Sequence, residues 1–463
     1  MKKKEKTEAK IIDYCAIIKK FEQTADKYAQ YTALIYNNKS ITYQQLNEKA
    51  NQLAHYLEDK LNKNKDPIAL CMSLSIEAIV SLLAILKTSR IYVPIDPDYP
   101  LERQLYILND TDAKLVIVDN LTEASITSHS ILWINPFKEN AQIASMPKNN
   151  LGIYPNLREL IAIYYTSGST GYPKGVMETH VGFYNRLLWS SKHYTLDTTD
   201  ITLQLISIGF GISFFEIMHP LLSGAQIVIT PQGTQREASK IIAAIQQYSV
   251  TFFHLVPTIL MRLLKQEDFK SCKTLKKISC GGEVLSTSLY LELQKVLPCE
   301  LYNAYGSTEV SVAITHHIVG HCLQYDSIPI GRAIDNVEIL ILDDKLQLVP
   351  TGSIGMLYVG GLCLAQGYWR NKSLTDEKFI SYSDNNGNKK ILYNTGDLVF
   401  KLSDDNIIYV GRNDQQIKIK GCRIELQEIQ YHLYKQENIE ESVVLYRPYI
   451  NDGFLMALLH KSL

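Results

Sequence analysis

The chain of 463 residues is long enough for two or three domains and for a large buried core. Hydrophobic residues make up 46% and charged residues 21%, an ordinary globular composition that excludes a disordered, collagen-like or coiled-coil chain. The 47 Lys and Arg residues nearly balance the 48 Asp and Glu residues, so no general attraction to nucleic acid or to an anionic membrane is expected. Any anionic ligand must therefore bind at a local site.

The eight cysteines contain no Cys-x-x-Cys pair, which argues against a zinc ribbon and against a dithiol redox centre. The basic amino terminus is interrupted by charged residues and has no apolar region of the kind found in signal peptides. The longest apolar stretch, 76–86, is too short to span a bilayer and contains Glu77. We predict a cytoplasmic protein with neither a membrane nor a nucleic acid as partner.

The first part of the chain has the pattern of an α/β protein. Thr42 and Gln45 predict a helix start, and apolar residues follow at helical spacing up to Leu61. Short apolar runs at 68–72, 91–95 and 115–118 then alternate with helical patterns at 76–87 and 101–109. The same rhythm returns from Leu160 to Cys280, so two α/β units with parallel sheets are expected.

The pattern changes at about residue 328 to short strands separated by turn signals, which predicts a β-rich unit. Beyond Arg412 a polar ribbon leads to a predicted helix at 425–434 and to two apolar runs, 442–445 and 454–459. This last segment has only about fifty residues, which is small for an independent domain.

A Gly- and Ser-rich loop follows the apolar run 160–165, with the sequence Thr166-Ser-Gly-Ser-Thr-Gly-Tyr-Pro-Lys-Gly175. Its four hydroxyls, three glycines and Lys174 can direct hydrogen-bond donors toward phosphate. The loop is not a Walker A motif, which excludes P-loop kinases and GTPases. The alternative is a Gly/Ser-rich surface turn without a ligand.

Seven segments in this order resemble the AMP-forming adenylate-forming superfamily, and within it the adenylation domains of nonribosomal peptide synthetases. The segments are 41–46, 86–96, 166–175, 303–309, 360–369, 393–398 and 411–426. The resemblance implies two α/β subdomains plus a distorted β-barrel in a large N-terminal core, residues 1–412. A short, partial α+β lid would follow in residues 413–463.

The implied reaction is attack of a carboxylate on the α-phosphate of ATP, which gives acyl-AMP and pyrophosphate. Because like-charged partners must meet, positive charges and amide donors do most of the catalytic work. The resemblance assigns the phosphates to the loop, the α-phosphate to Thr308 and Mg²⁺ to Glu309. Within the loop the residues concerned are Thr166, Ser167, Gly168, Ser169, Thr170, Gly171 and Lys174.

The nucleoside would be held by a second group of residues. Adenine would lie between Asn303, the ring of Tyr305 and a wall formed by Gly281, Gly282 and Glu283. Asp397 can accept hydrogen bonds from both ribose hydroxyls, and Arg412 would add a polar contact. Each of these assignments has a non-functional alternative. Glu309 could be an exposed carboxylate, Tyr305 an aromatic residue of the core, and Asp397 a residue of a turn.

The predicted acid pocket departs from the family pattern. Amino-acid-activating domains carry an aspartate directly after Phe210, which pairs with the α-ammonium group, but Gly211 stands here. A bound ammonium without that counter-charge would cost several kcal/mol in a dry site, so a standard α-amino acid is not expected. The rest of the pocket would be apolar with one imidazole, which suits an α-keto, hydroxy or aryl acid: Ile212, Phe215, His254, Ile278, Cys280, Ala304, Val312 and Ala313. His254 could bind a substrate oxygen or be an ordinary core histidine.

The lid is the second departure. The family lid carries a Gly-Lys motif whose lysine reaches the substrate carboxylate and the α-phosphate, and no such motif follows Phe454; Lys461 stands in a different context. Asp414 matches the hinge about which the lid turns. We expect slow adenylation by this chain alone, with a separate lid-bearing polypeptide as one way to complete the site.

Two classes of function stay open at this point. The first is an acid-activating ligase that passes its acyl group to the phosphopantetheine thiol of a carrier protein, with coenzyme A as the alternative acceptor. The second is a non-catalytic relative that binds a nucleotide or an acyl-adenylate and acts through partners. The phosphate loop, Glu309, Asp397 and Arg412 favour an active ligase. The absence of the Gly-Lys motif in the lid favours a non-catalytic relative.

Overall fold

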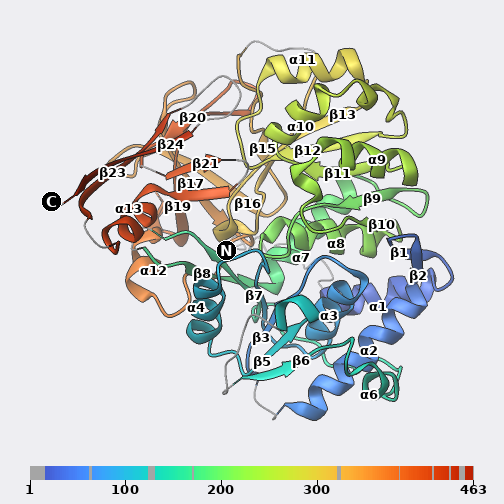
Figure 1. Ribbon diagram of the computed structural model, residues 1–463. Helices are drawn as coiled ribbons and strands as arrows, with labels where there is room; N and C mark the ends of the chain where they lie inside the picture. The colour runs from blue at the N-terminus through green and yellow to red at the C-terminus, as the bar shows by residue number, and fades with distance from the viewer. Residues whose placement is uncertain are drawn as a thin grey trace, which may run out of the picture.

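The computed structural model describes residues 16–61, 65–123, 131–168, 171–320, 325–384, 386–414, 416–419, 422–436, 439–447 and 454–461. They form two α/β units, an antiparallel sheet and a C-terminal group of two hairpins and a helix (Figure 1). Within this part of the chain, no helix is long and apolar enough to cross a bilayer.

The first α/β unit is built on a six-stranded sheet with the order β6-β5-β3-β4-β7-β8. Its strands are β3 (Ile68–Cys71), β4 (Tyr92–Pro94), β5 (Leu115–Val118), β6 (Leu132–Ile134), β7 (Leu160–Thr166) and β8 (Lys174–Thr179). Its helices are α2 (Tyr43–Lys60), α3 (Ile76–Lys87), α4 (Leu101–Thr111), α5 (Asn120–Glu123) and α6 (Asn140–Ala144). All neighbouring strands run parallel except β8, which runs antiparallel to β7.

The predicted helix starts of this unit are confirmed. The Thr42 hydroxyl accepts from the backbone N–H of Gln45, whose side chain accepts in return from the Thr42 N–H, so α2 begins with a capping box. The Ser75 hydroxyl caps α3 by accepting from the Ala78 N–H. Because α3 is apolar on nearly every side, it packs between layers and is buried along its length.

The second α/β unit has a nine-stranded sheet with the order β15-β14-β13-β12-β11-β9-β10-β1-β2. Its strands are β1 (Thr32–Tyr36), β2 (Lys39–Thr42), β9 (Ile201–Gln204), β10 (Gln226–Ile229), β11 (Phe252–Leu255), β12 (Lys277–Gly281), β13 (Glu300–Tyr305), β14 (Thr315–Ile318) and β15 (Arg332–Ala333). Its helices and 3₁₀ turns are α1 (Ile17–Lys27), α7 (His180–His193), α8 (Gly211–Ser223), α9 (Ala238–Tyr248), α10 (Pro257–Leu264), α11 (Thr287–Val296), η1 (Thr234–Arg236), η2 (Glu267–Ser271) and η3 (Thr308–Val310).

One hydrophobic core joins the two units. The amino-terminal hairpin β1–β2 belongs to the second sheet, where β1 pairs in parallel with β10, although the chain then enters the first unit. Helices α1, α2, α3, α7 and α8 pack together between the sheets and share one cluster of buried side chains. The two units are therefore held in a fixed relation by α-helical packing.

The β-rich unit expected after residue 328 is a five-stranded antiparallel sheet. Its elements are β16 (Val337–Leu342), β17 (Gly355–Gly361), β18 (Phe379–Ser383), β19 (Lys389–Lys401), β20 (Ile407–Arg412) and the helix α12 (Lys372–Lys378). The long strand β19 pairs with β17, β18 and β20, and register shifts interrupt its pairing with β17 and β20. Such bulges bend a strand. Asp397 of β19 contacts the second α/β unit, where the Tyr305 hydroxyl of β13 donates to its carboxylate.

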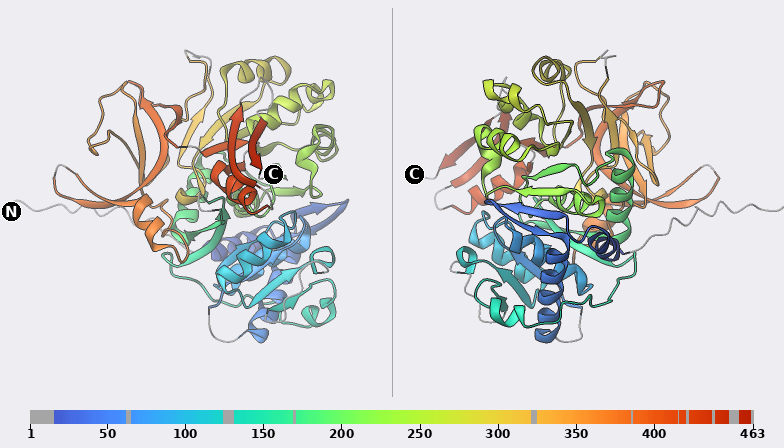
Figure 2. Two further views of the ribbon diagram at one scale, coloured as in Figure 1. Left: turned by 60° about the vertical axis from the view of Figure 1, so that its left-hand side comes forward. Right: turned by 90° about the vertical axis from the view of Figure 1, so that its right-hand side faces the viewer.

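The C-terminal group consists of β21 (Gln416–Ile419), β22 (Cys422–Glu425), α13 (Leu426–Tyr434), β23 (Ile439–Arg447) and β24 (Phe454–Lys461). We call this group the lid. In Figure 2 the lid, in red, lies over the boundary between the blue first unit and the green second unit. The domain boundary at residue 412 and the incompleteness of the lid stay predictions.

Candidate active site

The predicted phosphate loop, residues 166–175, joins the antiparallel strands β7 and β8, whose pairing begins with Thr166 opposite Lys174. The loop is thus a hairpin connection between two strands and does not lead into a helix. Its donors are therefore backbone N–H groups, hydroxyls and Lys174, without the contribution of a helix terminus.

Two glycines in this loop are required by close contacts. A Cβ on Gly168 would lie 2.1 Å from the carbonyl oxygen of Tyr172. Gly171 has a φ of +85°, and a Cβ there would meet the ring of Tyr431 from the lid at 2.2 Å. Ser169 and Thr170, which we expected to bind phosphate, lie outside the described residues.

Glu309, the expected Mg²⁺ ligand, lies in η3 and is fully buried. Nη1 of Arg423 donates to both of its oxygens, at 2.6 and 2.9 Å, and the Tyr368 hydroxyl donates to Oε1 at 2.9 Å. Burial alone would raise the pKa of Glu309, but the charge of Arg423 holds it well below its usual range. The carboxylate is therefore ionised and paired with a cation from β22.

Lys174 lies beside this ion pair. Its ammonium group is 3.9 Å from Oε1 of Glu425 and 5.1 Å from the centre of the Tyr368 ring. Burial and, after it, the like charge of Arg423 lower the pKa of Lys174 to about 8. A group of phosphates would stabilise the charged form of this lysine.

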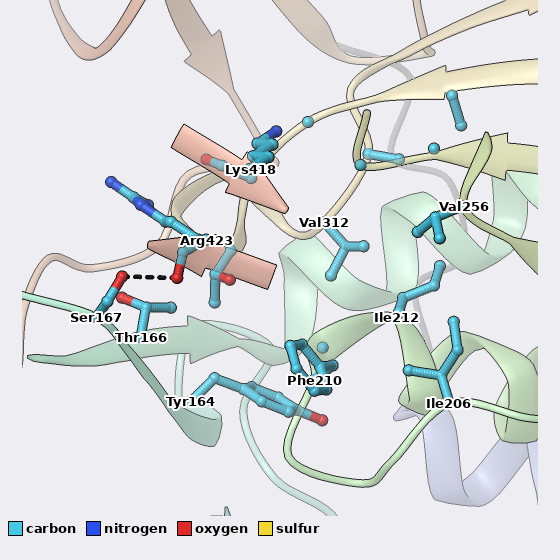
Figure 3. A pocket seen from close by; sticks show the side chains of 18 of the residues that line it. Tyr164, Thr166, Ser167, Ile206, Phe210, Ile212, Val256, Val312, Lys418 and Arg423 are labelled. Carbon is cyan, nitrogen blue, oxygen red and sulfur yellow. Dashed lines mark hydrogen bonds between the residues drawn. The ribbon is translucent and has the colours of Figure 1, made fainter. Parts of the chain in front are cut away.

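The lid closes this side of the site. The Ser167 hydroxyl donates to the carbonyl oxygen of Arg423 at 2.9 Å, as Figure 3 shows. The Gly168 N–H donates to Oε2 of Glu428 at 3.3 Å, and Arg103 lies 3.7 Å from the same carboxylate. In this conformation the phosphate loop thus binds the lid directly.

A cavity of about 380 Å³ extends from the phosphate loop into the second α/β unit. In Figure 3, Thr166 and Ser167 lie at one side of it under the β21–β22 hairpin, while Ile206, Ile212 and Val256 lie at the other. The expected site residues that line it are Thr166, Ser167, Phe210, Gly211, Ile212, His254, Cys280, Gly281, Gly282, Ala304, Thr308, Val312, Ala313, Asp397 and Arg412. We call the part lined by Ile212, His254 and Val312 the acid side.

Five buried polar atoms on residues that line the cavity have no hydrogen-bond partner among the described residues. They are Nε of Arg103 and of Arg423 and the hydroxyl oxygens of Tyr164, Thr166 and Ser307. Unpaired buried donors cost free energy, so their presence in one cavity indicates a site that a polar ligand completes. Phosphate oxygens accept hydrogen bonds from both kinds of group.

On the acid side, Gly211 begins α8 and leaves room for Val312. A Cβ on Gly211 would lie 2.8 Å from Cγ2 of Val312. The backbone at Val312 has a φ of +73°, a left-handed conformation that is unusual for a β-branched residue. The strained backbone at Val312 therefore places a methyl group in the space that an aspartate at position 211 would need.

Two residues expected in the acid pocket do not line the cavity. Phe215 lies one turn further along α8 and packs against Phe183 at 5.2 Å between ring centres. Ile278 is buried in the core of the second unit, while the cavity meets β12 only from Ser279 onward. The family resemblance predicted the right strand and helix for these two residues, but it did not show that both lie outside the lining of the cavity.

His254 lines the acid side from the end of β11. Burial lowers its pKa to about 3, so the ring is neutral at physiological pH. Its ring lies 4.8 Å from that of Phe252 and 6.1 Å from that of Tyr194, both edge to face. A neutral imidazole here can donate or accept one hydrogen bond to a substrate.

A second cavity of about 380 Å³ adjoins the first and contains the predicted nucleoside residues. It is lined by Gly282, Glu283, Asn303, Tyr305 and Arg412, among others. The Tyr305 hydroxyl donates to Oδ2 of Asp397, and Nη1 of Arg412 donates to Oδ1 of the same group at 2.6 Å. Each carboxylate oxygen retains a lone pair, so Asp397 can still accept hydrogen bonds from a ribose.

Asn303 and Glu283 are both engaged within the protein. The Asn303 amide donates to the carbonyl oxygens of Ile328 and Pro329, at 3.3 and 2.9 Å. Oε2 of Glu283 accepts from the N–H and the hydroxyl of Thr258, in the first turn of α10. They form the wall of the second cavity from fixed positions.

The expected hinge residue, Asp414, is held by Arg412, whose Nε and Nη2 donate to its two oxygens at 2.7 and 2.6 Å. The Gln416 N–H adds a third bond to this carboxylate, at 3.1 Å. The role of Asp414 as a hinge stays a prediction.

The first cavity is also lined by cations that we did not predict as site residues: Arg103, Arg186, Lys418 and Arg423. Lys418 also lines the second cavity, with its ammonium group 5.9 Å from the centre of the Tyr305 ring, and burial lowers its pKa. Lys418 and Arg423 lie in segment 411–426, which resembles the family, and this position could have identified them as site residues. Arg103 and Arg186 lie in helices outside the matched segments, and nothing in the sequence marked them as site residues.

The geometry fits a class of protein: two α/β units, a Gly- and Ser-rich loop between two strands and a buried carboxylate, Asp397, under a C-terminal lid match the arrangement expected of adenylate-forming enzymes. The comparisons agree, because the family model described as AMP-binding enzyme matches residues 21–369. The chain belongs to the AMP-binding enzyme family.

Curated relatives include a bacitracin synthase and a tyrocidine synthase. Bacitracin synthase 2 of Bacillus licheniformis is 35% identical over 427 residues, which cover 92% of this chain and 16% of the relative. Tyrocidine synthase 3 of Brevibacillus parabrevis is 34% identical, over 92% of this chain and 6% of the relative. The chain thus spans about a sixth or less of the length of these relatives.

Solved structures share the fold. The fused adenylation-PCP di-domain NpsA-ThdA from Klebsiella oxytoca superposes with a TM-score of 0.88 at 24% identity, over 97% of this chain and 89% of that one. The N-terminal subdomain of NpsA, solved in complex with 3-hydroxybenzoyl-AMSN, gives a TM-score of 0.77 at 24% identity, over 86% of this chain and 100% of that one.

Proposed function

We propose that this chain activates a carboxylic acid as acyl-AMP. One oxygen of the acid's carboxylate bonds to the α-phosphorus of ATP, and the bond from that phosphorus to the bridging oxygen of pyrophosphate breaks. The observation that carries the proposal is that Thr166 and Arg423 line the cavity with unpaired polar atoms and adjoin two charged residues just outside its lining: Thr166 is opposite Lys174 in the hairpin, and Arg423 pairs with Glu309. Those groups suit the phosphates and the metal of ATP.

In this proposal the chain's own residues position and neutralise charge. Thr166, Ser167 and Lys174 bind the leaving phosphates, and Thr308 contacts the α-phosphate. Glu309 is a hard oxygen donor, which fits Mg²⁺ because that ion keeps several waters and uses one or two carboxylates. The ion would neutralise phosphate charge when bound.

The nucleoside would occupy the second cavity and the adjoining part of the first, which Asp397 lines. Asp397 is buried, fixed by Tyr305 and Arg412, and retains lone pairs for ribose hydroxyls. Tyr305 offers its ring as one wall for adenine, and Gly282 lines the same cavity.

In this conformation, Arg423 occupies the carboxylate that Mg²⁺ would need. Glu309 could hold Mg²⁺ only after it releases Arg423, whose guanidinium could then bind a phosphate oxygen. We propose that this exchange moves the lid by rotation next to Asp414.

The acid is proposed to lack an α-ammonium group. Gly211 provides no carboxylate, and Val312 occupies the space an aspartate would need. The solved NpsA subdomain, which shares the fold, holds a 3-hydroxybenzoyl ligand, an acyl group without an α-amine. The acceptor of the acyl group is proposed to be a carrier-protein phosphopantetheine thiol, since NpsA-ThdA joins an adenylation domain to a PCP.

The test is acid-dependent exchange of labelled pyrophosphate into ATP by the purified chain. We expect exchange with an α-keto acid or an aryl acid and little with the matched amino acid. Exchange that requires an α-amino acid would contradict the acid assignment. ATP binding without any acid-dependent exchange would favour the non-catalytic relative instead.

A further inference from the structure

Arg186 is a buried cation on α7 that lines the first cavity. Only 3% of its surface is exposed. Its Nη1 donates to the Ser190 hydroxyl at 2.9 Å, and that hydroxyl donates in turn to the Arg186 carbonyl oxygen. Ser190 therefore orients the guanidinium but brings no negative charge.

No carboxylate pairs with Arg186 anywhere in the part of the chain that the structure describes. The guanidinium instead lies over three aromatic rings, with its carbon 4.9 Å from the centre of Trp189, 5.8 Å from Tyr194 and 5.9 Å from Phe215. Cation–π contacts of this kind offset part of the cost of burial. They leave the full positive charge in place.

The surrounding titratable groups do not supply a counter-charge either. They include three imidazoles, His219, His254 and His316, whose pKa values are all lowered by burial and further by the charge of Arg186. Neutral imidazoles can accept hydrogen bonds but cannot balance a cation. Among the described residues, the acid side of the cavity therefore carries one uncompensated positive charge.

Buried charges in proteins are normally paired, because an isolated ion in a low-dielectric site is costly. The other cations that line this cavity have acidic neighbours. Arg423 pairs with Glu309, Arg412 with Asp397 and Asp414, and Arg103 with Glu428, while Lys418 lies in the field of Asp397. Arg186 differs from all of them, and it faces the space where the acid would lie. A guanidinium matches a carboxylate in a two-point geometry.

This inference rests on the proposed acid activation. We propose that the acid carries a second carboxylate, which pairs with Arg186 on the acid side while its first carboxylate attacks ATP. Arg186 would then determine specificity for dicarboxylic acids over acids of the same length that end in a methyl group. Gly211 and Val312 fit the same assignment, since neither places a carboxylate on this side to repel such a substrate.

The test is binding of two stable acyl-adenylate mimics, succinyl-sulfamoyl-adenosine and butyryl-sulfamoyl-adenosine, by calorimetry. The two ligands differ only by the terminal carboxylate in place of a methyl group. For the unaltered chain we expect the succinyl mimic to bind at least about tenfold more tightly. Arg186→Met should remove this preference, and Arg186→Lys should restore part of it because the charge returns without the two-point geometry.

The outcomes separate the two proposals. Equal affinity of the two mimics for the unaltered chain, or a preference that survives in Arg186→Met, overturns the role of Arg186 and leaves acid activation standing. Failure of the chain to bind either mimic overturns the proposed function itself. If Arg186→Met does not fold, the comparison of the two mimics on the unaltered chain still decides. Pyrophosphate exchange with succinate, glutarate and adipate against butyrate, pentanoate and hexanoate extends the test to turnover.

Discussion

Replacing Arg423 with methionine tests the ion pair that joins the lid to the core. The pair is fully buried on the Glu309 side and only 18% exposed on the Arg423 side, with contacts of 2.6 and 2.9 Å. Removing one partner of a buried pair costs about 3–5 kcal/mol, because an unpaired charge remains. Each kcal/mol shifts the unfolding midpoint of a cooperative unit of about 150–250 residues by roughly 2–4 °C, so we expect a loss of about 6 °C or more.

The loss should depend on pH in a defined direction. In the unaltered chain the pKa of Glu309 is depressed, so its contribution to stability is present above its unfolded pKa of about 4.3 and is lost only as pH falls. Without Arg423, burial raises this pKa, although Lys174 still opposes the rise. The stability of the variant is then lost as pH rises through the new value. The difference between the two proteins should therefore grow from about pH 5 to about pH 8.

The assay is the thermal unfolding midpoint at about pH 5, 6, 7 and 8 for the unaltered chain, Arg423→Met and Arg423→Met/Glu309→Gln. The double variant carries no unpaired charge, so it should recover stability and lose the extra pH dependence. Lys114→Met, which breaks the exposed pair with Asp112, is the control and should shift the midpoint by about 2 °C or less. A double variant no more stable than the single one, or a difference that is constant with pH, would refute the argument.

Three further predictions concern the ligands. In the unaltered chain, ATP affinity should fall as pH rises through the Lys174 pKa of about 8, because the lysine loses its charge. Lys174→Met should bind ATP more weakly at neutral pH and should not show this fall. Calorimetry at a series of pH values measures both effects. Asp397→Asn should bind AMP about tenfold more weakly and no longer distinguish it from 2′,3′-dideoxy-AMP, whereas equal discrimination in both proteins would contradict the ribose assignment. Gly211→Asp should shift pyrophosphate exchange toward amino acids only when it is combined with Val312→Ala, because the new Cβ would lie 2.8 Å from a methyl group of Val312. If the single variant already prefers amino acids, Val312 does not block the aspartate.

The sequence predicted the secondary structure well where local signals are strong. The capping box at Thr42 and the apolar run of α3 placed both helices within a residue or two of their observed bounds. The pairing of β1 with β10 was not predicted, because parallel partners far apart in the sequence leave no local mark. A hydrophobic run indicates that a strand forms but not which sheet it joins.

The candidate site was predicted unevenly for a similar reason. Matched blocks identified Asp397, Tyr305 and Arg412, and the structure brings them into contact. The family resemblance could not show that Ile278 is buried in the core and does not line the cavity, since the position of a side chain relative to a cavity depends on how the neighbouring elements pack. Arg186 was missed because nothing in a helix sequence distinguishes a buried cation that faces a cavity from one that reaches solvent.

The charges of the site suggest how one cavity can hold both ATP and the lid. The two buried carboxylates that a nucleotide would use already have partners from the chain: Arg423 for Glu309, and Arg412 for Asp397. The cost of burying these charges is therefore offset before any ligand arrives. If Mg²⁺ and phosphates bound as proposed, Glu309 and Arg423 would exchange partners, and neither buried charge would be left unpaired. Because Arg423 lies on β22, that exchange would remove one of the contacts that hold the lid on the core, beside those made by Ser167 and Gly168.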